Sequence, residues 1–136
     1  MGTLKDLFDC DEFERMLGSE VVEAREGYGR VRMTVKPCHL NLGGICHGGV
    51  IFALADMAFG VAANSRGKLT LSLNAGITFL KPAHLGELYA EAREVMNHGK
   101  VPFIEVRVTD GQGELIALMT SSGYRKREDL QVDGLM

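Results

Sequence analysis

The stretch Asn41-Leu-Gly-Gly-Ile-Cys-His-Gly-Gly49, followed by the apolar run Val50–Ala63, decides the fold of this chain. The first part is a glycine-containing loop that can bring backbone N–H groups and polar side chains close to a ligand. The second part is typical of a helix that is apolar on every face, which predicts that this helix is buried. Its one charged residue is Asp56. Burying an unpaired carboxylate costs several kcal/mol, so we expect a specific role for this side chain.

Amphipathic segments surround the helix on both sides. Lys5–Leu17 has apolar residues near helical spacing and is followed by Gly18, a common helix terminator, which predicts one short N-terminal helix. Leu69–Leu80 alternates, with leucines on one face and Thr70, Ser72 and Asn74 on the other, which predicts a strand with one buried face. The expected strands are residues 21–26, 30–36, 69–80, 87–96, 101–109 and 114–125.

These elements predict an α+β fold in which an antiparallel sheet wraps around one long central helix, because a single apolar helix needs a sheet to cover it. No repeat or linker divides the sequence, so we expect one domain over residues 1–136, with a tail that frays from about residue 127. The chain is long enough to build a core of its own.

Composition excludes several classes of function. The formal net charge is −3, which argues against nucleic-acid binding through a large basic surface. The sequence has no run of 18 apolar residues, so we expect no membrane span. The acidic first seventeen residues do not resemble a signal peptide. The three cysteines form no CxxC pair and predict no disulfide framework. We therefore expect a cytoplasmic protein with reduced thiols.

The spacing of His47 and Asp56 constrains any site that uses both. Nine steps of about 100° bring them half a turn out of phase, with about 13 Å of rise, if both lie on one helix. They cannot then act as a pair within one chain. Either His47 lies in the preceding loop, or the site combines two copies of the chain. We favour the second arrangement.

The helix start itself suggests a chemistry. Gly48 and Gly49 stand where the helix begins, and the first N–H groups of a helix have no internal partner and carry partial positive charge. A carbonyl oxygen that becomes an oxyanion is stabilised by such donors. Asp56 is about two turns further on and can act as a general base on water or as a nucleophile.

Simpler interpretations of the same residues remain open. Asp56 can hydrogen-bond a neighbouring loop and fix the helix, and His47 can be a structural histidine. Cys46 and His47 can be taken for a nucleophile and its base, although neighbours on a helix do not face each other. Cys38-His39 together with Cys46-His47 suggests zinc, but the spacing matches no usual pattern. We expect no metal.

The motif Asn41-x5-His47-Gly48-Gly49-x6-Asp56 resembles the signature of hotdog-fold acyl-CoA thioesterases, and is most similar to their PaaI-like branch. Residues 72–83, Ser-Leu-Asn-Ala-Gly-Ile-Thr-Phe-Leu-Lys-Pro-Ala, are similar to that family's strand after the central helix. The order of elements also matches a hotdog fold. The resemblance covers about residues 15 to 125.

The resemblance implies roles for individual residues. Asp56 matches the carboxylate that attacks the thioester or activates water, and Gly48 matches the backbone N–H that polarises the thioester carbonyl. His47 and Asn41 match residues that position the carbonyl or the water from the facing subunit. Ser72 falls where relatives carry a hydroxyl that helps to hold the water. Family members are dimers that share one continuous sheet, often paired into tetramers.

The resemblance therefore implies a cofactor-independent acyl-CoA thioesterase that needs a homodimer and forms a homotetramer. Gly49 and Asn74 are further candidates for binding substrate. The resemblance does not identify the residues that bind the CoA phosphates. The candidates are Lys81, Arg66, Lys68 and Arg125. Two competitors stay open: a hotdog hydratase or dehydratase of acyl thioesters, and a hotdog module that binds acyl-CoA without catalysis.

Overall fold

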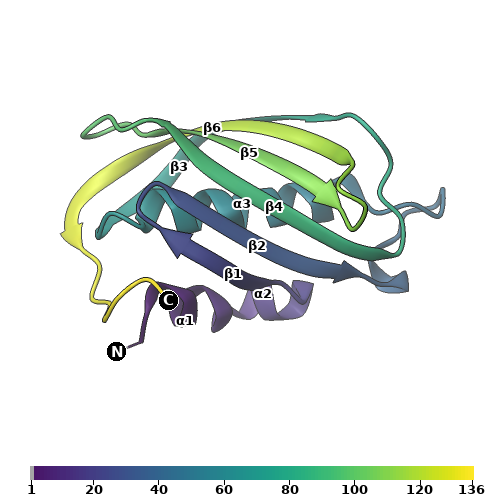
Figure 1. Cartoon of the computed structure of the whole chain (residues 1–136), viewed down its shortest axis with the longest axis horizontal. Coiled ribbons are helices and arrows are strands. Elements are labelled where there is room, and N and C mark those ends of the chain that lie inside the picture. The colour runs from purple at the N-terminus through teal and green to yellow at the C-terminus, as the bar shows by residue number, and fades with distance from the viewer. Residues whose placement is uncertain (1) are drawn as a thin grey trace.

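The computed structural model describes residues 2–136 and shows six strands and one long helix (Figure 1). The elements follow the predicted order, with an additional short N-terminal helix and one 3-10 turn. In chain order they are α1 (Leu4–Asp9), α2 (Glu12–Leu17), β1 (Glu20–Arg25), β2 (Tyr28–Val35), η1 (Pro37–His39), α3 (Gly48–Asn64), β3 (Lys68–Phe79), β4 (Gly86–Met96), β5 (Phe103–Asp110) and β6 (Leu115–Asp129).

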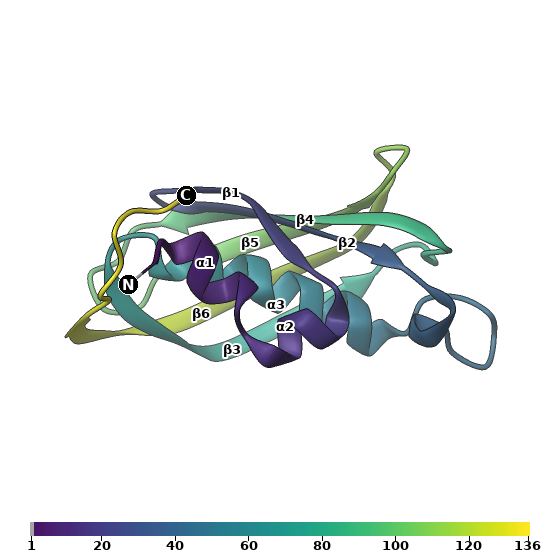
Figure 2. The same cartoon turned by 90° about the horizontal axis from the view of Figure 1, so that it is seen from below.

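The six strands form one antiparallel sheet in the order β1-β2-β4-β5-β6-β3. The sheet curves around α3, which packs against its inner face (Figures 1 and 2). β3 follows α3 in sequence but lies at the far edge of the sheet, where it pairs only with β6. The predicted α+β hotdog fold is confirmed.

The sheet-facing side of α3 forms the centre of the core. Leu54, Ala58 and Val61 have no exposed surface. β2 lies directly against the helix at Gly29, where an added Cβ atom would stand 2.8 Å from the Val61 side chain, so this close approach requires glycine. No helix within residues 2–136 is long and apolar enough to cross a membrane.

The N-terminal segment forms two helices rather than the single helix expected over Lys5–Leu17. The break falls at Cys10 and Asp11, because the Asp11 side chain caps a second helix by accepting hydrogen bonds from the N–H groups of Phe13 and Glu14. Gly18 ends α2 in the left-handed conformation, with φ 86°, as its place in the sequence predicts.

α1 covers the β1 edge of the sheet (Figures 1 and 2). The Lys5 ammonium donates to the Val21 carbonyl at 2.7 Å, and the Asp9 carboxylate accepts from the Val21 N–H at 2.9 Å. The C-terminal segment ties the start of α1: the carbonyls of Gly134 and Leu135 accept from its first two N–H groups. β6 also extends to Asp129, so pairing continues past residue 127, where we expected fraying.

β3 differs from the strand expected at Leu69–Leu80. Leu71 and Leu73 are 52% and 62% exposed, whereas Thr70 is buried. The reason is a bulge between Ser72 and Asn74, which pair with consecutive residues of β6 and leave Leu73 as an extra residue. The bulge shifts the alternation by one, so the predicted buried face was wrong for the first half of the strand. β3 is therefore a long sheet edge with exposed leucines.

Candidate active site

The start of α3 offers two hydrogen-bond donors without acceptors. His47 occupies the N-cap position but its side chain makes no capping hydrogen bond. The N–H groups of Val50 and Ile51 bond to the His47 carbonyl at 3.0 and 3.2 Å. Within residues 2–136, the N–H groups of Gly48 and Gly49 have no acceptor. They point out of a 17-residue helix at its positive end, where a partly negative oxygen is favoured.

The loop before α3 positions Asn41 beside this helix start. The Asn41 Oδ1 atom accepts from the N–H groups of Gly43 at 2.9 Å and Ile45 at 3.4 Å, so the side chain holds the loop together. This arrangement leaves the Nδ2 group of Asn41 without an acceptor in the described part of the chain. Asn41 and Gly48 line the same cleft, which has a volume of about 460 Å³. Asn41 can therefore donate to a group bound there.

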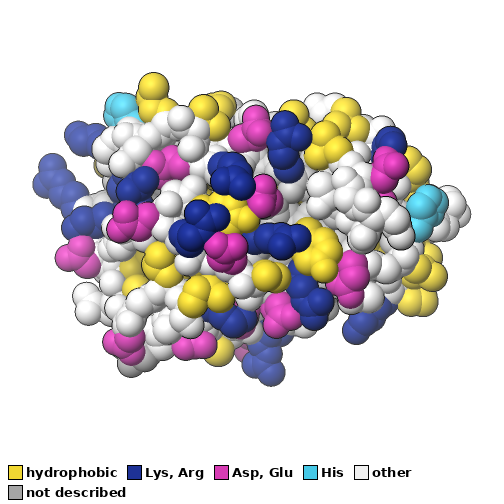
Figure 3. Space-filling view, viewed as in Figure 1, with side chains coloured by type: hydrophobic (Ala, Val, Ile, Leu, Met, Phe, Trp, Pro, Cys, Tyr) yellow, Lys and Arg dark blue, Asp and Glu magenta, His cyan; other side chains and the backbone are white. Residues whose placement is uncertain are grey.

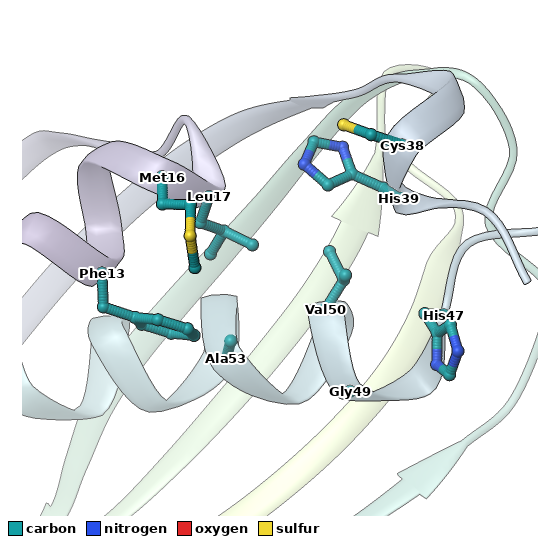
Figure 4. A pocket seen from close by; sticks show the side chains of 9 residues that line it. All are labelled: Phe13, Met16, Leu17, Cys38, His39, His47, Gly49, Val50 and Ala53. Atoms are coloured by element: carbon teal, nitrogen blue, oxygen red, sulfur yellow. The ribbon is translucent and has the colours of Figure 1, made fainter.

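A second cleft, of about 430 Å³, lies on the other side of the helix start (Figure 4). His47 and Gly49 line one end of it. The remaining lining comes from three elements and is mostly apolar: Phe13, Met16 and Leu17 of α2, Cys38 and His39 of η1, and Val50 and Ala53 of α3. We did not predict the part played by α2, because the sequence does not show which surface α2 faces.

Asp56 lies on the face of α3 turned away from the sheet. It is exposed, which corrects the prediction that the whole helix is buried: the sheet covers only one side of α3 in the single chain. Within residues 2–136 the Asp56 carboxylate has no hydrogen-bond or ion-pair partner, so nothing supports a role in fixing a loop. Partial removal from water by its surroundings raises the pKa of Asp56 above its ordinary value. An unpaired carboxylate of raised pKa is a stronger base.

Gly48 and Asp56 cannot act on one bond within a single chain. Eight helical steps separate them by about 12 Å along the axis, whereas reacting groups must come within about 3–3.5 Å. His47 lies at the N-cap, in the loop before α3, which is the first of the two arrangements that its spacing from Asp56 allowed. The distance between the Gly48 N–H group and the Asp56 carboxylate remains, so these two groups cannot meet within one chain.

Ser72 and Asn74 lie on β3 and both are exposed. Ser72 precedes the bulge and shares with Thr70 the side of the strand that faces α3. Asn74 follows the bulge, and its backbone carbonyl accepts from the Ser121 hydroxyl at 2.9 Å. Neither residue lines the two clefts at the start of α3. Their roles stay predictions.

The structure does not favour the cysteine chemistries. Cys46 is buried, and burial raises the pKa of its thiol to about 11. Its Sγ atom lies 3.6 Å from the His47 carbonyl oxygen rather than against the imidazole. A thiol of this kind is a poor nucleophile. Among residues 2–136, no three His, Cys, Asp or Glu side chains lie together in a way that could hold a metal ion.

A six-stranded antiparallel sheet around one helix defines a hotdog protein, and in this chain the helix start has free N–H groups. Residues 43–117 match the thioesterase superfamily. This stretch begins after Asn41 and runs through α3 and β3 to β5 into the start of β6. The chain belongs to the thioesterase superfamily, in its PaaI-like branch. It is accordingly a hydrolase of thioester bonds, as predicted.

Three relatives illustrate this membership. A putative esterase of Archaeoglobus fulgidus is 43% identical over 90% of this chain and 80% of its own. The acyl-coenzyme A thioesterase PaaI of Escherichia coli is 31% identical over 88% of this chain and 86% of its own, and its solved structure superposes with a TM-score of 0.88 over 91% of each chain. A Streptococcus mutans protein, solved bound to acetyl CoA, is 27% identical with a TM-score of 0.79 over 82% of this chain and 91% of its own.

Proposed function

We propose that this protein hydrolyses the thioester of an acyl-CoA or aryl-acyl-CoA to the free acid and CoA. One observation carries the proposal: unpaired N–H groups at the start of α3 and an unpaired carboxylate of raised pKa on the same helix. An acyl-CoA thioesterase and a protein solved with acetyl CoA among the relatives support this substrate class. The three free cysteines agree with a reducing, cytoplasmic location.

The reaction follows from the two groups. The thioester carbonyl oxygen lies on the Gly48 N–H, with Gly49, Asn41 and His47 helping to position it. Asp56 of the opposing chain takes a proton from water, and the water oxygen attacks the carbonyl carbon. The Gly48 N–H then stabilises the tetrahedral oxyanion. Collapse of this intermediate breaks the carbon–sulfur bond, and the CoA thiolate leaves and takes up the proton that Asp56 removed from water.

Two residues of β3, Ser72 and Asn74, are proposed to act beside the Asp56 carboxylate. Ser72 lies on the side of β3 that faces α3. From there its hydroxyl can hold the water that Asp56 activates. Asn74 is a weaker candidate for binding substrate, since it follows the bulge on the exposed edge. In the alternative reaction, Asp56 attacks the carbonyl carbon itself and water hydrolyses the resulting anhydride.

The β3 edge is the surface that brings two chains together in this proposal. It is twelve residues long, pairs on one side only and exposes Leu71 and Leu73. An exposed, apolar sheet edge is a template for pairing with another strand. Pairing β3 with its copy would make one continuous sheet and bring the uncovered faces of the two α3 helices together. We propose a homodimer on this edge and a homotetramer of two such dimers.

An apolar cleft beside the proposed oxyanion donors can hold the acyl group. The cleft of about 430 Å³ begins at His47 and Gly49 and runs between α2 and α3 (Figure 4). Its walls include Phe13, Met16 and Val50. Its volume is within the usual range for small-molecule pockets. We propose that the acyl chain lies there.

A panel of saturated and aryl acyl-CoA esters, assayed for release of free thiol, tests the proposal. Turnover by the wild-type protein and its collapse in Asp56→Asn, with ligand affinity kept, are expected. A hydratase or dehydratase would release no thiol from these esters. A binding module would bind them without turnover, and Asp56→Asn would leave that binding unchanged. Absence of turnover across the panel contradicts the proposal.

A further inference from the structure

The cleft between α2 and α3 contains few polar groups. Figure 3 shows Lys, Arg, Asp and Glu side chains side by side over the strands, where they form ion pairs such as that of Arg32 with Glu20. The nine residues that line the cleft include no Lys, Arg, Asp or Glu. The polar side chains among them are Cys38, His39 and His47. His47 lies at the end where the thioester is proposed to bind, so His39 is the imidazole that faces the acyl group itself.

His39, in η1, is held in one position. The residue is only 8% exposed. Its Nδ1 atom accepts a hydrogen bond from the Lys36 N–H at 2.9 Å, and its backbone carbonyl accepts from the His47 N–H at 2.8 Å. The second bond joins His39 to the residue that precedes α3. The imidazole therefore keeps a fixed place beside the start of the helix.

The bond to Lys36 also fixes where the imidazole carries its proton. A neutral imidazole has one N–H, and its other nitrogen is an acceptor. Because Nδ1 accepts, the proton belongs to Nε2. Within residues 2–136, Nε2 has no acceptor, and it is not among the side-chain atoms that are sealed from solvent without a partner. Figure 4 shows the far edge of the ring turned into the cleft, toward Leu17 of α2.

An unpaired donor in an apolar cleft favours a ligand with an acceptor. The thiol of Cys38 is only a weak acceptor, and His47 lies at the thioester end, so the cleft has no good acceptor of its own beside His39. A hydroxyl on the acyl group would therefore accept from Nε2–H but leave its own proton unpaired. A carboxylate would bring a charge into apolar surroundings. A keto oxygen accepts and has no proton to place.

We propose that His39 is a specificity-determining residue whose Nε2–H donates to the keto oxygen of an oxoacyl group bound in this cleft. The inference rests on the proposed function, which places the acyl chain there. A plain hydrocarbon chain covers the Nε2–H and leaves it without an acceptor, which lowers affinity. The protein should accordingly prefer oxoacyl thioesters to the saturated acyl thioesters of the same length.

Decanoyl-CoA and its 3-oxo, 5-oxo and 7-oxo derivatives test the inference in the thiol-release assay. The ester whose keto oxygen reaches Nε2 should show a kcat/KM about tenfold or more above that of decanoyl-CoA, as expected when a buried donor gains its acceptor. The hydroxy ester with its oxygen on the same carbon should fall between them. Equal kcat/KM values for decanoyl-CoA and all three oxo esters would overturn the inference.

Two variants of His39 separate the cleft-facing donor from the structural bond. His39→Asn places an amide oxygen where Nδ1 accepts from Lys36 and withdraws the donor from the cleft, so the preference for the oxo ester should disappear. His39→Gln reaches the position of Nε2 with an amide N–H but loses the acceptor for Lys36. It should keep most of the preference and have a lower Tm.

Cys38→Ala is the matched control, because Cys38 lines the same cleft. This variant should keep the preference for the oxo ester. A preference that survives in His39→Asn, or that disappears equally in Cys38→Ala, would contradict the role of His39. A keto group close to the thioester also activates it chemically, so the comparison between variants decides the assignment.

Nitrogen-15 NMR of the wild-type imidazoles separates this inference from the proposed function and needs no variant. At least one of the three oxodecanoate acids should shift the His39 Nε2–H signal downfield, whereas decanoate should not. If no ester is hydrolysed but an oxodecanoate produces this shift, the proposed function fails and the role of His39 stands. If the esters are hydrolysed without preference and the signal does not move, the role of His39 fails and the proposed function stands.

Discussion

The two faces of α3 have the same helix geometry and opposite properties. The face toward the sheet carries Leu54, Ala58 and Val61, which have no exposed surface. The opposite face carries Gly49 and Asp56, which are exposed, and Asp56 has no partner in the described chain. The first face holds the fold together. The second face carries the unpaired carboxylate of the proposed site.

The contrast between the two faces separates the residues that stabilise the fold from those available for function. A packed face tolerates few substitutions, because each smaller side chain loses buried apolar surface and leaves a cavity. An open face with a charged residue is not needed for folding, so that residue requires another explanation. Substitutions on the two faces should therefore separate stability from activity.

The largest effect is expected at Asp56. Asp56→Asn should lower kcat by about 10²–10⁴, the usual contribution of a general base, measured by thiol release. The raised pKa of Asp56 means that the folded state favours the protonated form, so its ionised form lowers stability once the pH exceeds the ordinary pKa. Asp56→Asn should therefore leave Tm unchanged or raise it at pH 7. A clear fall in Tm would show that Asp56 fixes the fold.

Leu54→Ala is the matched change on the packed face. It should lower the free energy of unfolding by about 2–5 kcal/mol, as for other buried leucines, with kcat per folded molecule kept. Denaturant unfolding and active-site titration measure the two quantities. A variant of Leu54 with normal stability would contradict the assignment of this face to the core.

The start of α3 should show the next largest effect. Gly48→Pro removes one N–H group that has no acceptor in the chain, and proline is favoured at the first helical position. His47, with φ −59° and ψ 135°, already has a conformation that proline permits in the preceding residue. Loss of one oxyanion donor should lower kcat by about 10²–10³. Gly48→Ala keeps the N–H and serves as control; equal loss in both variants would assign the effect to crowding against Phe79.

The two edges of the sheet offer a further comparison. Leu73→Glu adds charge to the exposed β3 edge, whereas Val22→Glu does so on β1, which α1 covers. Leu73→Glu should weaken the dimer at least tenfold and lower activity at low protein concentration, measured by analytical ultracentrifugation beside the thiol assay. Val22→Glu should leave the dimer intact. The reverse order would place the interface on the β1 edge.

The smallest effect concerns pH. A general base works only when ionised, so kcat/KM should fall as the pH drops through the pKa of Asp56. Because that pKa is raised, the midpoint should lie above 3.8. The measurement is the pH profile of the wild type with a saturated acyl-CoA. A midpoint at or below 3.8 would contradict an unpaired, partly desolvated carboxylate.

The sequence predicted much of this structure because the dominant signals are local. The apolar run after Gly49 predicted the bounds of α3, and alternation predicted the six strands. Local patterns did not predict that β3 lies at the far edge of the sheet, beside β6 rather than β4. The two errors in burial have tertiary causes. The bulge at Leu73 depends on pairing with β6, and the exposure of Asp56 depends on how far the sheet reaches around α3.

The site was predictable only in part, for the same reason. The motif pointed to Gly48 and Asp56, and the spacing of His47 and Asp56 left two arrangements open, of which we favoured a site shared by two chains. The side chains that shape the apolar cleft come from α2, η1 and α3, so no local pattern could group Phe13 with His39 and His47. Such groupings arise from packing.

If Gly48 of one chain and Asp56 of another form one site, mixing two inactive variants should restore part of the activity. Gly48→Pro and Asp56→Asn chains, unfolded and refolded together in equal amounts, should form heterodimers in half of the molecules, each with one intact site. We predict recovery of about a quarter of wild-type activity. A mixture that stays as inactive as its components, although heterodimers form, would show that the site lies within one chain and not between two.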